Sequence, residues 1–140
     1  MMRSAIVLTA GLLLGGCTFP CTLIGCSNQV TFQLGTAGQH FGVDEPVLVR
    51  ACVGTQCAEE TVTNTADGTS SSSGTALMLL QGRLTFQFAT AVTGSQTVTL
   101  ELKKNGNVVF SDQRDNIAFV SSSPNGPGCA PVCQQATVSL

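Results

Sequence analysis

The stretch TVTLELKKNGNVVF, residues 97–110, decides the fold class of this chain. Val98, Leu100 and Leu102 alternate with polar side chains, which is the period of a strand with one buried face. Asn105-Gly106 follows directly, and this dipeptide is the strongest short-range signal for a hairpin because both residues tolerate positive φ. The apolar residues after it return as a second strand. Residues 97–110 therefore predict a β-hairpin.

Short strand patterns recur along the rest of the chain. Val47 to Val53 is nearly all apolar or β-branched, which is typical of a central strand. Strands are expected over residues 30–34, 47–53, 59–63, 76–80, 84–88, 98–102, 108–110, 117–120 and 136–140. No stretch of ten or more residues after the N-terminal segment has a helical apolar period. These patterns predict an all-β fold, a single antiparallel β-sandwich of about eight strands with immunoglobulin-like or fibronectin-like architecture.

Segments rich in Gly, Ser, Asn and Pro separate these strands. Residues 35–42, 64–74, 112–116 and 121–131 are expected to be loops or turns, since these residue types favour turn conformations and interrupt sheet ladders.

The first 17 residues carry a targeting signal. Arg3 precedes an apolar segment, residues 5–14, which has the length of a secretory h-region and is too short to span a bilayer. The segment ends in Leu14-Gly15-Gly16-Cys17, which resembles the lipobox of bacterial lipoproteins. This resemblance implies a diacylglyceryl group on the Cys17 thiol and cleavage after Gly16. The alternative is an ordinary signal peptide in which Cys17 is a disulfide cysteine.

The expected organisation has three parts. Residues 1–16 are the signal peptide, residues 17–28 the lipid anchor and tether, and residues 29–140 the sandwich domain. The lipoprotein resemblance implies a lipid-anchored protein of the cell membrane or outer membrane that faces the periplasm or the exterior. Thr18 resembles the residue that permits sorting to an outer membrane. The membrane, through the anchor, and an envelope protein or ligand are the expected partners.

Composition excludes several classes of function. Charged residues make up 10% of the chain and the formal net charge is −2. Lys103-Lys104 is the only adjacent basic pair, so nucleic acid is not an expected partner. Trp and Tyr are absent, which weighs against a carbohydrate-stacking surface. Apolar residues make up 43% of the chain, and this content favours a packed core over disorder.

The six cysteines besides Cys17 predict three disulfides in an exported protein. Their spacing does not match zinc sites, which use closely paired ligands. Local pairing is expected, with Cys21 bonded to Cys26, Cys52 to Cys57 and Cys129 to Cys133. Such small rings would leave the core folded after reduction. The competing arrangement joins the tether to a distant element, for example Cys26 to Cys129.

One histidine offers the only candidate for acid–base chemistry near neutral pH. His40 lies close in sequence to Asp44 and Glu45. A polar loop residue is the favoured interpretation, because no catalytic sequence motif accompanies it. Met78 is expected to fill core rather than to bind copper.

Two acidic segments could bind calcium only weakly. They are Glu59-Glu60 and residues 112–116, and neither has the spacing of a dedicated calcium loop. Strand alternation puts Glu59 and Glu60 on opposite faces of a sheet, so they cannot chelate together. Both segments are expected to be solvated turns. No catalytic, cofactor-binding or metal-binding residue is assigned.

Two classes of function follow. The first is a lipid-anchored β-sandwich with a non-catalytic binding or structural role in the cell envelope. The second is an envelope hydrolase or metal-handling protein with a site assembled from loops around His40. A pocket that gathers His40 with a carboxylate would favour the second.

Overall fold

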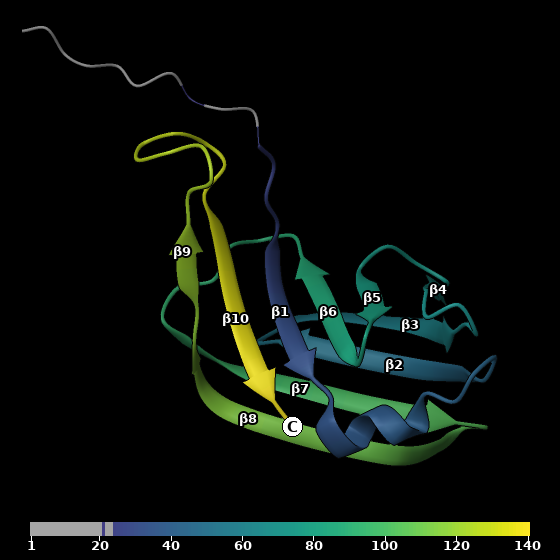
Figure 1. The fold of residues 1–140 in the computed structure, drawn as a ribbon. Coiled ribbons are helices and arrows are strands. Elements are labelled where there is room, and N and C mark those ends of the chain that lie inside the picture. The colour runs from purple at the N-terminus through teal and green to yellow at the C-terminus, as the bar shows by residue number, and fades with distance from the viewer. Residues whose placement is uncertain (1–20, 22–23) are drawn as a thin grey trace, which may run out of the picture.

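The described part of the chain forms two five-stranded sheets. The computed structural model describes residue 21 and residues 24–140, which contain ten strands and one short 3-10 helix (Figure 1). The predicted all-β fold is confirmed, with more strands than the eight or so expected. The signal segment and Cys17 lie outside the described residues.

The first sheet has the strand order β5-β6-β1-β10-β9. Its strands are β5 (Leu77–Leu80), β6 (Arg83–Phe88), β1 (Asn28–Gln33), β10 (Cys133–Ser139) and β9 (Val120–Ser122). β1 lies between β6, to which it is antiparallel, and β10, to which it is parallel. Val30 faces Phe86 of β6 on one side and Ala136 of β10 on the other. The first and last strands of the domain are thus neighbours.

The second sheet has the strand order β4-β3-β2-β7-β8 and is antiparallel throughout. Its strands are β4 (Ser70–Ser72), β3 (Gln56–Asn64), β2 (Pro46–Val53), β7 (Ser95–Lys104) and β8 (Asn107–Ala118). β2 is the middle strand, and its side chains Val47, Val49 and Ala51 are fully buried. The prediction of a central strand here is confirmed.

The hairpin predicted from residues 97–110 joins β7 to β8. Asn105 and Gly106 have φ of 50° and 78°, the positive values that a two-residue hairpin turn requires. Val98, Leu100 and Leu102 on β7 are buried to 1% exposure or less, so the alternation was interpreted correctly.

The inward faces of the two sheets share one hydrophobic core. Val30 and Phe32 of β1 and Leu84 of β6 are buried to 1% exposure or less, as alternation predicts. Val49 and Leu100 enter the same core from the second sheet. One continuous apolar layer between the sheets therefore accounts for the period-2 pattern of the sequence.

Four segments predicted as loops contain regular structure. Residues 112–116 belong to β8, residues 70–72 form β4, residues 121 and 122 belong to β9 (Val120–Ser122), and residues 35–40 form the 3-10 helix η1 (Gly35–His40). The three strands lie at sheet edges and bury few side chains in these segments, so they lack a clear apolar alternation. η1 buries only Ala37 and is too short for a helical period.

β8 also bends along its length. Its pairing with β7 shifts register twice, and Asn116 has φ of 58°. Such bulges are common on edge strands.

Among the described residues, no helix has the length and apolarity needed to cross a membrane.

Candidate functional site

The tether before β1 is bonded to the segment before β10. Cys21 forms a disulfide with Cys129 and Cys26 with Cys133, with Cα–Cα distances of 5.7 and 6.1 Å. The partners are 108 and 107 residues apart in sequence. The predicted local pairs Cys21–Cys26 and Cys129–Cys133 are wrong.

The strand pairing explains this error. Cys26 lies two residues before the start of β1, and Cys133 is the first residue of β10. Because β1 and β10 are parallel neighbours, the residues just ahead of both strands lie side by side. The competing arrangement, a tether joined to a distant element, has the right form, although the partner of Cys26 is Cys133 rather than Cys129. The sequence contains no local signal for the parallel pairing.

Hydrogen bonds reinforce the two disulfides. Asn125 is buried to 7% exposure, accepts a 2.8 Å hydrogen bond from the Ile24 amide and donates a 2.6 Å hydrogen bond to the Ala130 carbonyl. The amide of Gln134 donates to Asn28 Oδ1 at 2.9 Å. We call this end of the domain, residue 21 with residues 24–27 and the loop 123–132, the anchor pole. Sequence reasoning missed Asn125, since the Ser, Pro and Gly residues around it indicate only a loop.

The third disulfide joins Cys52 to Cys57 and is the predicted local pair. The two residues face each other across β2 and β3, with Cα atoms 4.1 Å apart. A short hairpin loop sets this distance, so the prediction from spacing is confirmed.

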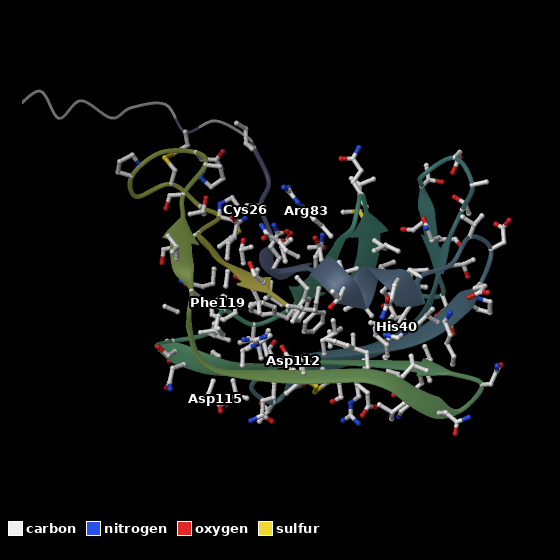
Figure 2. All side chains as sticks on the ribbon, turned by 60° about the horizontal axis from the view of Figure 1, so that its bottom comes forward. Cys26, His40, Arg83, Asp112, Asp115 and Phe119 are labelled. Carbon is white, nitrogen blue, oxygen red and sulfur yellow. A yellow bond between two sulfur atoms is a disulfide. The ribbon has the colours of Figure 1, made fainter. Side chains whose placement is uncertain are left out.

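His40 does not share a site with the acidic residues near it in sequence. His40 ends η1 (Figure 2). Its ring centroid lies 6.2 Å from that of Phe110 on β8. Glu45 instead forms an ion pair with Lys104 at 2.5 Å, and this partner lowers the pKa of Glu45. Asp44 donates its backbone N–H to the Asn64 carbonyl. Within residues 21 and 24–140, no three His, Cys, Asp or Glu side chains form a group that could hold a metal ion.

Glu59 and Glu60 lie on opposite faces of β3, as alternation predicts, but neither is in a turn. Glu59 is exposed, whereas Glu60 points toward β5 of the other sheet. The Glu60 carboxylate accepts hydrogen bonds from Ser72 Oγ at 2.6 Å and from the amides of Ala76 at 2.8 Å and Leu77 at 3.1 Å. The solvated-turn prediction is therefore wrong for Glu60, which bridges the two sheets.

Ser70 continues this bridge along the outer edge of β5. Its hydroxyl accepts from the Leu79 amide at 3.2 Å and donates to the Leu79 carbonyl at 2.5 Å. We call Glu60, Ser70 and Ser72 the seam. The seam satisfies backbone groups that an edge strand would otherwise leave open for pairing.

The seam also changes the titration of Glu60. Partial burial alone would raise its pKa, but the hydrogen bonds from Ser72 and from the backbone amides of Ala76, Leu77 and Thr75 outweigh burial. The pKa of Glu60 is therefore held below its ordinary value of 4.5.

Residues 112–116 lie in β8 rather than in a turn, and their carboxylates have protein partners. Asp112 pairs with Arg114 at 2.6 Å, and Asp115 accepts hydrogen bonds from Thr97 at 2.8 Å and Gln113 at 3.1 Å. These contacts follow one strand and its neighbour and do not converge on one point.

A cavity of about 280 Å³ opens at the other end of β1 from the anchor pole. We call it the distal cavity. Its lining residues are Leu34, Gly38, Phe41, Asn64, Gly68, Leu79, Gln81 and Gly82. Leu34 and Phe41 supply apolar walls, and the Leu34 amide donates to the Gly82 carbonyl at 3.1 Å. Its size is near the lower limit for small-molecule sites.

Met78 precedes the cavity-lining residue Leu79 in sequence. The prediction that Met78 fills the core is wrong. It is 50% exposed, because the inward positions of β5 belong to Leu77 and Leu79.

Charged residues are distributed unequally between the sheets. The strands of the first sheet carry one charged residue, Arg83. Those of the second sheet carry Arg50, Glu59, Glu60, Glu101, Lys103, Lys104, Asp112, Arg114 and Asp115. No charged residue occurs in residues 21–43 or 116–140, which contain the whole anchor pole.

Comparisons with protein-family models, with curated proteins and with solved structures find no match to this chain.

Removing one long-range disulfide should cost much less than removing both. Either bond alone closes a loop of more than 100 residues, for which chain entropy gives about 4.7 kcal/mol. Once one bond is present, the other closes a further ring of about ten residues, worth somewhat under 3 kcal/mol. The variants Cys21→Ala/Cys129→Ala and Cys26→Ala/Cys133→Ala should each lose roughly 3 kcal/mol, and the quadruple variant roughly 7 kcal/mol.

Urea unfolding of the unlipidated mature domain measures these losses. The variant Cys52→Ala/Cys57→Ala is the control, because its small separate ring should contribute about 2 kcal/mol whether or not the other bonds are present. If removing one long-range disulfide cost as much stability as removing both, the idea that the two bonds close the same long loop would be wrong.

The seam should make folding depend on the charge of Glu60. A carboxyl with a lowered pKa stabilises the fold above its unfolded pKa, and this contribution disappears as pH falls through the folded pKa. Glu60→Gln should therefore cost about 1–3 kcal/mol at pH 7, and its deficit relative to wild type should shrink below about pH 4.5.

Denaturation midpoints between pH 2 and 7 test this expectation. Glu59→Gln, on the solvent face of the same strand, is the matched control and should show no such deficit. The hydroxyls of Thr65 and Thr69 lower the pKa of Asp67 to about 2, but this effect is common to all three proteins and cancels in the differences. A Glu60→Gln deficit that stays constant with pH would refute the role of the charge.

Proposed function

We propose that this chain is a lipid-anchored, disulfide-stabilised extracytoplasmic lipoprotein with a non-catalytic binding or structural role in the cell envelope. One observation carries the proposal: the six other cysteines are all bonded to one another. No described cysteine is thus left to pair with Cys17, which favours the lipobox over an ordinary signal peptide. Three disulfides also fit an oxidising compartment outside the cytoplasm.

The proposal extends to the architecture of the domain, an immunoglobulin-like or fibronectin-like β-sandwich. Two facing sheets with one shared core support this assignment. Such a framework says little about chemistry by itself, because one sandwich fold serves many functions.

The distal cavity is the proposed place for a binding role. Its walls come from Leu34, Phe41 and Leu79, and Asn64 and Gln81 lie at it with amide groups that can form hydrogen bonds. A small, largely apolar group with one polar atom fits this lining.

The alternative, a hydrolase or metal-handling protein built around His40, needs a carboxylate gathered with the imidazole. Glu45 is engaged with Lys104, and His40 is not among the residues that line the distal cavity. The binding or structural role is therefore the better-supported proposal.

Acylation of Cys17 is tested by metabolic labelling with a palmitate analogue. The full chain should incorporate the label, and Cys17→Ala should not, because the thiol is the proposed attachment atom. Cys52→Ala/Cys57→Ala controls for labelling of other cysteines and should match wild type. Equal labelling of wild type and Cys17→Ala would contradict the anchor.

Binding in the distal cavity is tested by NMR titration with benzyl alcohol, which has one ring and one hydroxyl. Saturable shifts are expected at Leu34, Phe41 and Leu79. Gly38→Leu should abolish them, because an added Cβ meets only Leu34 Cβ, at 3.7 Å, and the longer side chain would occupy the cavity.

The matched control is Gly25→Leu at the anchor pole, where a Cβ meets nothing within 4 Å. It should leave the titration unchanged. Shifts that persist in Gly38→Leu would show that the alcohol binds elsewhere.

A further inference from the structure

We propose that the anchor pole is a membrane-docking surface, through which Ile24 and Val132 contact the bilayer that holds the Cys17 lipid. This inference rests on the proposed lipid anchor. It adds an orientation: the domain stands on the membrane with one defined end down.

The chain between the lipidation site and the domain is too short to let the anchor pole leave the membrane. Four residue steps separate Cys17 from Cys21, and a fully extended chain spans at most about 14 Å over that length. Cys21 is bonded to Cys129 in the loop 123–132. The lipid is thus attached to the folded domain through a very short segment, so the anchor pole cannot move far from the bilayer surface.

The anchor pole exposes apolar side chains. Ile24 is 56% exposed and Val132 is 52% exposed. Pro127, Ala130 and Pro131, which belong to the same loop as Val132, are exposed as well. Burial of aliphatic surface in the interface is favourable in proportion to its area. The pole therefore offers apolar groups where the tether brings the membrane.

The described residues of the anchor pole carry no charged side chain. Soluble surfaces normally carry many charged side chains, yet residues 21, 24–43 and 116–140 contain none. A charged group brought against lipid would lose hydration, and carboxylates would also be repelled by anionic lipids. The charged residues Asp112 and Asp115 lie instead on β8 of the second sheet, whereas Cys26 marks the entry of the tether into the first (Figure 2).

A tryptophan reporter can test the contact, because the chain has no Trp or Tyr. Val132→Trp places the reporter at the anchor pole. Val108→Trp is the matched control: Val108 is 53% exposed, against 52% for Val132. It lies near the start of β8, on the order of 30 Å along the strand from the end that leads toward the anchor pole. Both full-length lipidated proteins are reconstituted into phosphatidylcholine vesicles with and without brominated acyl chains.

The expected result is a blue shift and strong quenching by brominated lipid for Val132→Trp, with neither for Val108→Trp. Ile24→Trp is a second pole reporter, should Val132→Trp fail to fold as judged by circular dichroism, and should behave as Val132→Trp does. Equal, unquenched emission from the pole and control reporters on vesicles would overturn the inference.

Two further outcomes separate the possible failures. A blue shift at the pole without quenching by brominated lipid would mean that protein, either a second copy or a partner, covers the pole, and the docking inference would be wrong. Lipid-processed protein that does not float with the vesicles would refute the anchor itself, and the docking inference with it. Flotation is measured separately from fluorescence, so the two failures cannot be confused.

Discussion

The parallel pairing of β1 with β10 is the constraint on which the rest of the structure depends. β1 is an interior strand, so its backbone groups are satisfied on one side by β6 and on the other by the last strand of the domain. The first sheet is therefore complete only when both ends of the domain have met. Two disulfides hold the segments just ahead of these strands, which fixes the pairing at its open end.

This closure also explains why the contributions of the two disulfides to stability depend on each other. They join the same two segments, so the long loop between the ends is closed once and not twice. Asn125 completes the joint by satisfying an amide of the tether and a carbonyl of the opposite loop. A buried amide side chain with partners in both segments favours one relative position of the two.

Sequence reasoning succeeded where the determining forces are local. Alternation at Val98, Leu100 and Leu102 identifies a strand because side chains repeat with period 2, and Asn105-Gly106 identifies its turn because few residues tolerate positive φ. Cys52 and Cys57 were paired correctly for the same reason, since a hairpin sets their distance. The edge strand β4 and the middle of β8, residues 112–116, escaped prediction, because they bury little and their polar residues resemble loops. The partners of Cys21 and Cys26 depend on which distant strand lies beside β1, and Glu60 depends on how the second sheet meets β5; neither relationship is encoded in a local pattern.

The positions of these features along the domain give the proposals one geometry. The anchor pole lies at the start of β1 and β10, and the distal cavity lies past the other end of β1, beside the turn between β5 and β6. On the proposed anchoring, the uncharged pole meets lipid and the cavity opens away from it. In this proposed orientation the carboxylates of the second sheet would remain in water and keep their hydration. A binding role and a membrane anchor therefore place compatible demands on this fold, because its two ends differ in chemistry and, on the proposed anchoring, the two disulfides would determine which end faces the membrane.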